Sequence, residues 1–214
     1  MKSTLLNMVA VLFGITLVAS AGVGAVYTIT AEPIEQSKKK AVADALTAVL
    51  PAFDQSQTTE LTIDGLPIVA YTATAGGQVV GYAVETMTKQ GFNGVVKLMA
   101  GFLPSGEVCN INVLEQSETP GLGTNMCNED NPLIKSFKGR NPGDMTLKVK
   151  KDGGDVDALT AATISSRAYT DAMTRAYAAF QAVSGTAAAQ EAECCCEETD
   201  NQTGCEVQEG GDNE

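Results

Sequence analysis

The stretch Asp157-Ala158-Leu159-Thr160-Ala161-Ala162-Thr163-Ile164-Ser165-Ser166 leads directly into the last helix that the sequence predicts. From Ile164 to Val183, apolar residues recur every three or four positions, which is typical of an amphipathic helix. Hydroxyl side chains at a helix start can cap it, and the free backbone N–H groups there attract anions. Taken alone, the stretch is therefore either a well-capped helix start or an anion site, where Ala161 and Ala162 leave room for a bulky group.

Extended runs separated by glycine-containing turns precede this helix. Gly76-Gly77 and Pro104-Ser105-Gly106 are typical of turns between strands. An earlier helix is expected over Ile34–Leu50, and Pro51, the next residue, is expected to end it. The order helix, strands, helix predicts an α+β domain with a short-stranded antiparallel or mixed sheet and flanking helices, and not a doubly wound sheet. The expected strands are Leu66–Ala73, Gln78–Thr86, Val95–Phe102, Val108–Leu114 and Thr146–Lys150.

The N-terminal segment, residues 1–31, has no charged residue from Ser3 to Ala31. Because about 20 apolar helical residues cross a hydrocarbon core of ~30 Å, this segment is long enough to span a membrane. Lys2, the apolar run and Ala19-Ser20-Ala21 also fit a cleaved signal peptide. The uncharged stretch continues beyond what a signal peptide needs, which favours a retained single transmembrane helix. Basic residues flank both ends, so charge alone leaves the orientation open.

Composition excludes several classes of function. With 14 basic and 26 acidic residues and a net charge of −12, nucleic acid is not expected as a partner. The absence of histidine removes imidazole metal sites and histidine general bases.

The C-terminal tail, residues 185–214, is expected to be disordered, because Glu191–Glu214 holds nine acidic residues and no basic one. It also contains Cys194-Cys195-Cys196 and Cys205. Clustered thiolates can bind soft metals. This run lacks the spacers that let cysteines converge on one ion, so no metal site is assigned and the tail's role stays open.

A second distinctive stretch, Glu118-Thr119-Pro120-Gly121-Leu122-Gly123, follows an expected strand. Proline fixes one backbone angle, and the two glycines permit conformations that other residues rarely adopt. By itself the stretch is either an ordinary turn or a loop suited to the close approach of a planar ligand.

Together these stretches resemble the FMN-binding domain family, most closely the G subunit of Rnf-type ion-translocating electron transport complexes. That subunit is related to the C subunit of the Na⁺-translocating NADH:quinone reductase. The family signature, an Asp followed by a Ser/Thr-Gly-Ala-Thr core, is matched from Asp157 to Thr163, with Ala161 in place of the family's Gly. The Glu118–Gly123 loop is intact, Gly91–Gly94 resembles the family's glycine turn, and Gln116 stands where members often have His. The resemblance covers about residues 70–183 and the N-terminal anchor.

The resemblance implies an FMN-binding domain over residues 32–184, with FMN joined to Thr163 by a phosphodiester bond. An unaided threonine is a poor nucleophile and no histidine base exists, which fits attachment by a separate flavin transferase. Thr160, Ser165 and Ser166 would donate to the phosphate or cap the helix. The loop residues Thr119, Gly121, Leu122 and Gly123 would pack against the flavin ring, and Glu118 would be either a flavin-facing acceptor or a brace for the loop. No catalytic acid–base pair and no metal ligand is expected.

The function implied by the resemblance is electron transfer within a membrane-bound complex that translocates Na⁺ or H⁺, with the other membrane subunits as partners. The implied location is the cell inner (plasma) membrane, single-pass, with the FMN domain on the extracytoplasmic (periplasmic) side. One alternative is a membrane-anchored FMN-binding carrier outside such a complex. Another is a non-redox binding or structural protein that has lost the flavin, for which Ala161 is the best argument. On an extracytoplasmic face Cys109 and Cys127 could pair, or they are two free thiols.

Overall fold

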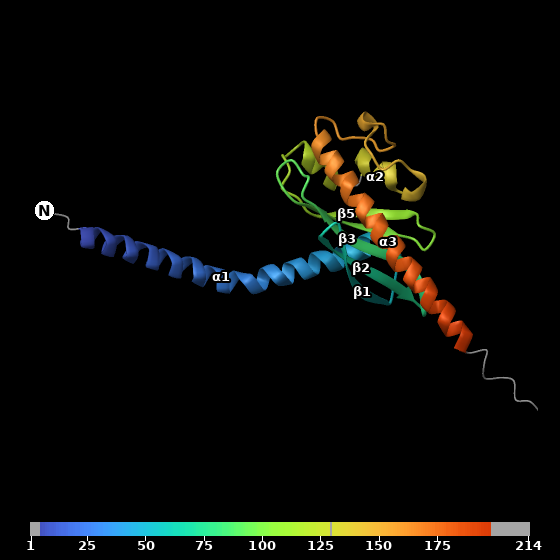
Figure 1. The fold of residues 1–214 in the computed structure, drawn as a ribbon, viewed down its shortest axis with the longest axis horizontal. Helices are drawn as coiled ribbons and strands as arrows, with labels where there is room; N and C mark the ends of the chain where they lie inside the picture. Colours follow the sequence, from blue (N-terminus) through green and yellow to red (C-terminus); the bar gives the residue numbers. More distant parts are fainter. Residues whose placement is uncertain (1–4, 129, 198–214) are drawn as a thin grey trace, which may run out of the picture. The chain divides into compact units, whose positions relative to one another are not determined.

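The computed structural model describes the backbone of residues 5–128 and 130–197, and the side chains of residues 7–128 and 130–185. The chain divides into two compact units, Met1–Ala45 and Leu46–Glu214. They are described separately below. Figure 1 shows their secondary structure.

The first unit contains most of helix α1, which spans Leu5–Val49 and whose last residues, from Leu46, belong to the second unit. The expected anchor and the expected Ile34–Leu50 helix are therefore one uninterrupted helix, and the boundary expected at residue 31 falls inside it. Its most apolar window has a mean hydropathy of 2.2, and none of that window is buried. By length and composition, α1 can cross a membrane, where its exposed apolar side chains would find apolar surroundings.

The second unit contains a five-stranded, fully antiparallel sheet in the order β1-β2-β3-β4-β5. Four of the five strands were expected, and the α+β fold is confirmed. The missed strand, β1, has the polar sequence Gln-Ser-Gln-Thr-Thr-Glu-Leu-Thr-Ile, which lacks a continuous apolar run. The strands are β1 (Gln55–Ile63), β2 (Leu66–Ala75), β3 (Gln78–Thr88), β4 (Val96–Phe102) and β5 (Val108–Glu115).

The prediction of a strand at Thr146–Lys150 is wrong. Val149 makes only an isolated bridge to Val156, and the 3-10 helix η3 (Lys150–Asp152) begins directly afterwards. The chain then reverses at Gly153, whose φ of +81° is in the left-handed region. The alternating pattern of Thr146–Lys150 therefore forms no strand ladder, because the chain turns back at Gly153, three residues after Lys150.

Helix α3 (Thr163–Glu197) packs across β1–β4 (Figure 1). The small residues Ala168, Ala172 and Ala176 are fully buried, so α3 lies close to the sheet. Phe180 on α3 stacks on Phe102 of β4 with ring centroids 4.9 Å apart. The prediction for Ile164–Val183 is confirmed: the segment is helical, and its apolar face packs against the sheet.

The C-terminal end of α3 extends beyond the boundary expected at residue 184, as far as Glu197. Alanine has the highest helix propensity, and Ala187–Ala189 favours this continuation over the disorder expected from residue 185. The rest of the expected tail, residues 198–214 with Cys205, lies outside the described residues, as do the side chains of Cys194–Cys196.

The last turn of α1, from Leu46 to Val49, belongs to the second unit, where the side chains of Leu46 and Val49 are buried. A Cβ atom on Gly101 would lie 2.0 Å from the carbonyl oxygen of Val49, so only glycine allows this close approach. The side-chain amide of Asn110 also donates to the carbonyl of Ala48 at 3.1 Å. The end of α1 is therefore fixed against β4 and β5.

The small helices between β5 and α3 complete the unit. The 3-10 helix η1 (Gly123–Cys127) follows the Glu118–Gly123 loop, and α2 (Pro132–Phe137) is capped by Asn131, whose side chain accepts from the N–H of Ile134. The 3-10 helix η2 (Pro142–Asp144) precedes η3.

Candidate functional site

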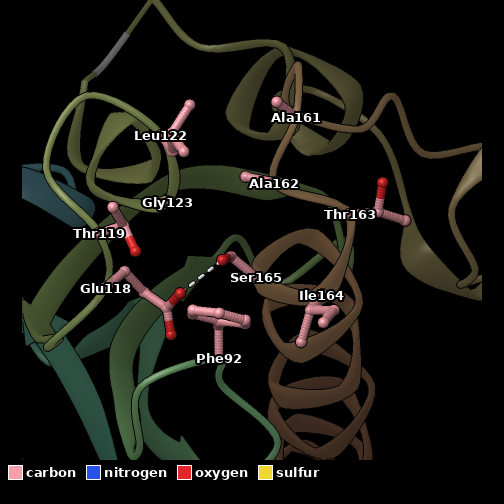
Figure 2. Close-up of a pocket in the computed structure, with 10 residues that line it drawn as sticks. All are labelled: Phe92, Glu118, Thr119, Leu122, Gly123, Ala161, Ala162, Thr163, Ile164 and Ser165. Atoms are coloured by element: carbon pink, nitrogen blue, oxygen red, sulfur yellow. Dashed lines mark hydrogen bonds between the residues drawn. The ribbon is translucent and has the colours of Figure 1, made fainter.

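Three segments meet at one edge of the sheet around a hollow of about 290 Å³ (Figure 2). Strands β3 and β5 are both antiparallel to β4, so their carboxyl ends lie at the same edge. The Gly91–Gly94 turn follows β3, the Glu118–Gly123 loop follows β5, and the start of α3 is the third segment. The lining residues are Phe92, Glu118, Thr119, Leu122, Gly123, Ala161, Ala162, Thr163, Ile164 and Ser165.

The hollow is surrounded by exposed apolar side chains. Phe92, Leu122 and Ile164 have 60%, 41% and 46% of their surface exposed. Among the described side chains outside α1, these are the large hydrophobic residues that reach such exposure, and each comes from a different segment. Exposed apolar groups gathered at one concave place mark a binding site for an apolar ligand or partner.

Glu118 ties the three segments together beneath this apolar rim. Its carboxylate is buried, with 5% of the residue exposed, and accepts the hydroxyl of Ser165 at 2.5 Å. Its other oxygen accepts the backbone N–H of Asn93 at 3.3 Å. The Glu118 N–H itself donates to the side-chain oxygen of Gln116 at 2.7 Å. Of the two expected roles for Glu118, the contacts therefore fit the brace.

The glycines of the loop have different tasks. A Cβ on Gly123 would lie 2.6 Å from the Cβ of Glu118, so Gly123 permits close packing at the floor of the hollow. Gly121 has a φ of +78° and turns the chain, while its N–H donates to the Thr124 hydroxyl at 2.9 Å. The carbonyl of Thr119 accepts the N–H of Leu122 at 3.2 Å. Thr119, Leu122 and Gly123 line the hollow, whereas Gly121 shapes the loop without lining it.

The hydroxyl residues at the start of α3 divide into two groups. Ser165 and Ser166 are buried, and the Ser166 hydroxyl donates to the carbonyl of Ala162 and accepts the N–H of Leu159, both at 2.9 Å. Both hydroxyls thus bind protein groups, Ser165 the carboxylate of Glu118 and Ser166 the backbone of Leu159 and Ala162, rather than the N–H groups of α3. Thr160 is exposed and does not line the hollow, while Thr163 is half-buried at its edge.

Ala161 has a strained backbone. Its φ of +59° lies in the left-handed region, where a Cβ atom is crowded. Glycine adopts this conformation without strain, and the family signature has Gly at this position. The chain therefore keeps this left-handed turn although it has alanine where the family signature has glycine.

A basic segment faces Thr163 from the side opposite the apolar rim. Figure 2 shows the Thr163 side chain pointing away from Leu122 and Glu118. Its hydroxyl oxygen accepts a hydrogen bond from the ammonium of Lys151 at 3.2 Å. Asp157 of the signature pairs with Lys150 at 2.6 Å, so its carboxylate contributes to the structure of this segment.

The structure adds Phe92, Ile164 and Lys151 to the residues expected at the site. Phe92 was recognised as part of the glycine turn but not as a lining residue. A large apolar side chain at an exposed position of the helix start is the signal that could have identified Ile164. Lys151 reaches Thr163 across twelve positions, and no spacing rule indicates such a contact.

Among the described residues, the two cysteines of the domain form no disulfide. Cys109 and Cys127 are both free, the first half-buried and the second exposed. No group of three or more metal-ligating side chains occurs among the described residues.

These features define the class of the protein, and the FMN-binding domain family matches residues 91–178, a range that contains all three segments around the hollow. The chain resembles three proteins that are each named as the G subunit of an ion-translocating oxidoreductase complex. It is 39% identical to the one from Shewanella loihica over 131 residues, 60% of this chain and 62% of that protein. It is 33% identical to the one from Shewanella baltica over 189 residues, 82% and 89% of the two chains. The third, from Vibrio cholerae serotype O1, is 35% identical over 164 residues, 70% and 78% of the two chains.

The chain belongs to the family of these FMN-binding G subunits. The resemblance recognised from the Glu118–Gly123 loop and the Asp157–Thr163 signature is confirmed. With an N-terminal helix able to cross a membrane, the chain is a membrane-anchored FMN-binding protein.

Proposed function

We propose that this protein is an electron-transfer subunit of a membrane-bound oxidoreductase complex that translocates Na⁺ or H⁺, and that it carries FMN covalently bound to Thr163. The observation that carries the proposal is the position of Thr163 beside a hollow rimmed by exposed apolar side chains. The complex is inferred from the names of the relatives.

The residues present fit FMN, which has a flat apolar ring and an anionic phosphate. Phe92, Leu122 and Ile164 offer apolar contact and would exclude water from the ring. Thr163 offers the hydroxyl for the phosphate end. When bound, FMN would supply the redox chemistry, while the chain supplies position and electrostatics.

The small size of the hollow suits electron exchange between proteins. Its volume of about 290 Å³ is at the lower end of the range for ligand pockets. A flavin would therefore keep part of its surface accessible to neighbouring membrane subunits. No independent catalysis is expected, because electrons would only pass through.

Attachment requires a separate flavin transferase in this proposal. The Thr163 oxygen would bond to the FMN phosphorus of a flavin dinucleotide, the pyrophosphate bond would break, and the nucleoside monophosphate would leave with the freed oxygen. The threonine proton must go to a base, and the group found at this hydroxyl is the ammonium of Lys151, a donor. The base would therefore come from the transferase.

The covalent attachment of FMN also favours one side of the membrane for the domain. A tethered cofactor cannot dissociate, which is an advantage on the extracytoplasmic side, where free FMN can be scarce. We therefore propose that the domain faces the periplasmic side of the inner membrane, held by α1.

The test is the intact mass of the full-length chain, purified in detergent after co-expression with a flavin transferase. We expect the wild type to gain the mass of FMN minus water and to fluoresce in gels, and Thr163→Val to do neither. Thr174→Val is the matched control, because Thr174 lies on the same helix, is exposed and donates to the carbonyl of Thr170 within that helix. It should be modified like the wild type.

Two results would overturn the proposal. One is an unmodified wild-type chain, and the other is a Thr163→Val chain that still gains the flavin. If the flavin is attached but no membrane subunits co-purify, the protein is a carrier outside such a complex.

A further inference from the structure

The segment Lys148–Gly154 contains three lysines with different partners, and Lys151 is the one that contacts the attachment threonine. Lys150 pairs with Asp157 at 2.6 Å. Lys151 makes no ion pair among the described residues and donates to the Thr163 hydroxyl at 3.2 Å instead. Lys148 carries the same charge in the same segment without contacting Thr163, which makes it a natural reference.

The acid nearest in sequence to Lys151 is already engaged. Both oxygens of Asp152 accept N–H groups of Arg167 at 2.7 Å. This bidentate pair, together with the nearby positive charges of Lys148 and Lys151, holds the pKa of Asp152 below its usual range. A neutral hydroxyl is a weaker partner for an ammonium than a carboxylate, so the positive charge of Lys151 is left only partly compensated.

The turn that presents Lys151 is sterically defined. Gly153 has a φ of +81°, and a Cβ on Gly154 would lie 2.0 Å from the carbonyl oxygen of Lys148. The N–H of Lys150 donates to the carbonyl of Val156 at 2.8 Å. The segment is thus closed by glycine geometry and backbone bonds, and Lys151 is held near Thr163 by more than its own flexible side chain.

We propose that Lys151 is the positioning residue for the phosphoryl group at Thr163, an inference that rests on the proposed attachment of FMN there. Esterification replaces the Thr163 O–H bond with an O–P bond, and the two remaining phosphoryl oxygens share one negative charge. Lys151 then exchanges a neutral acceptor, the hydroxyl oxygen, for an anionic phosphoryl oxygen that lies two bonds beyond it. Hydrogen bonds between ionised groups are shorter and about twice as strong as neutral ones.

The neighbouring groups make Lys151 the best-placed residue for this role. The hydroxyls of Ser165 and Ser166 bind Glu118 and the carbonyl of Ala162. The guanidinium of Arg167 is occupied by Asp152. Among the described residues around Thr163, Lys151 is the cation that donates its hydrogen bond to the modified oxygen itself.

The experiment compares full-length Lys151→Gln, Lys151→Arg and Lys148→Gln chains with the wild type, all in detergent and co-expressed with a flavin transferase. The first readout is the ³¹P resonance of the phosphodiester in loaded chains, which reports the charge beside the phosphorus without any redox activity. Lys151→Gln should move this resonance, and Lys148→Gln should leave it in place. The second readout is the time course of flavin attachment by intact mass, which Lys151→Gln should slow about tenfold and Lys151→Arg should largely restore.

The possible failures are distinguishable. A ³¹P resonance in Lys151→Gln that coincides with the wild type would overturn this inference alone, since the flavin would be attached and the proposed function would stand. An equal movement in Lys148→Gln would overturn it too, because any charge in the segment would then serve. A wild-type chain that never gains flavin would overturn the proposed function, and this inference with it.

Discussion

Replacing Ala161 with glycine should stabilise the domain, because the backbone of this residue is left-handed. Its φ is +59°, and the other non-glycine residue with positive φ in the described part is Asp64. The left-handed conformation costs a residue with a Cβ atom about 1–2 kcal/mol, and glycine is free of this cost. The greater freedom of glycine in the unfolded chain opposes the gain by about 0.4–1 kcal/mol. Ala161 is exposed, so little burial is lost. At the midpoints of these two ranges, the net rise in the free energy of unfolding is about 0.8 kcal/mol.

The assay is thermal unfolding of the full-length chain in detergent, followed by near-ultraviolet circular dichroism. This signal reports Tyr82 and Tyr169, which lie in the core of the second unit, and Tyr177, which packs against that core, and it is not dominated by α1. For a domain of this size, the predicted gain corresponds to a rise in melting temperature of about 1–4 °C.

The matched control is Ala178→Gly, the same chemical change at an exposed position inside α3. Glycine in a helix interior is less favourable than alanine by about 1 kcal/mol, so this variant should melt at a lower temperature. Opposite signs for the two substitutions are the expected result. A fall in melting temperature for both would show that Ala161 is not strained and would refute the reasoning.

Three further predictions concern other parts of the domain. Gly101→Ala should lower the free energy of unfolding by about 1–3 kcal/mol in the same melting assay, because the new Cβ would meet the carbonyl of Val49. Although Cys127 is exposed as a residue, the surrounding protein partly desolvates its sulfur and so raises the pKa of the thiol. Alkylation of this thiol, measured by peptide mapping, should therefore need a higher pH than that of a free thiol; a midpoint at or below the free-thiol value would contradict this. Because Arg167 lowers the pKa of Asp152, the stabilisation from their pair is present above the usual aspartate pKa of about 3.9 and disappears as pH falls through the lower folded value. Asp152→Asn should therefore destabilise the chain at neutral pH and match the wild type once that carboxyl is protonated; a constant difference at all pH values would contradict this.

The sheet was largely predictable because its turns and apolar runs are visible in the sequence. Gly76 and Gly77 have φ values of +60° and +82°, as a tight hairpin turn requires, and β2 and β3 flank them. Strand β1 was not predictable from pattern, since its polar residues are held by pairing with β2, which the sequence of β1 alone does not specify. The wrong prediction of a strand at Thr146–Lys150 is the reverse case, because its alternating pattern makes only one isolated bridge, from Val149 to Val156.

The same distinction applies to the candidate site: some of its features are visible in the local sequence, and others depend on contacts between distant segments. The Glu118–Gly123 loop was identified because its glycine and proline geometry is local. The role of Glu118 required the structure, because its bonds to Asn93 and Ser165 join segments separated by 25 and 47 positions. Lys151 was missed for the same reason. The motifs thus located the candidate site, and the structure was needed to show which distant groups its side chains contact.

The start of α3 has one apolar side and one basic side. These two sides suit the two tasks of a flavin site, which are to hold the ring and to hold the phosphate. Phe92 and Leu122 belong to an apolar rim on one side, whereas the Thr163 hydroxyl meets the ammonium of Lys151 on the other. FMN has the same division between an apolar ring and an anionic phosphate. Substitutions at the rim should therefore change the environment of a bound ring more than the attachment at Thr163, and substitutions at Lys151 should do the reverse. Such a division would allow one scaffold to keep its flavin covalently bound while the ring stays open to neighbouring subunits.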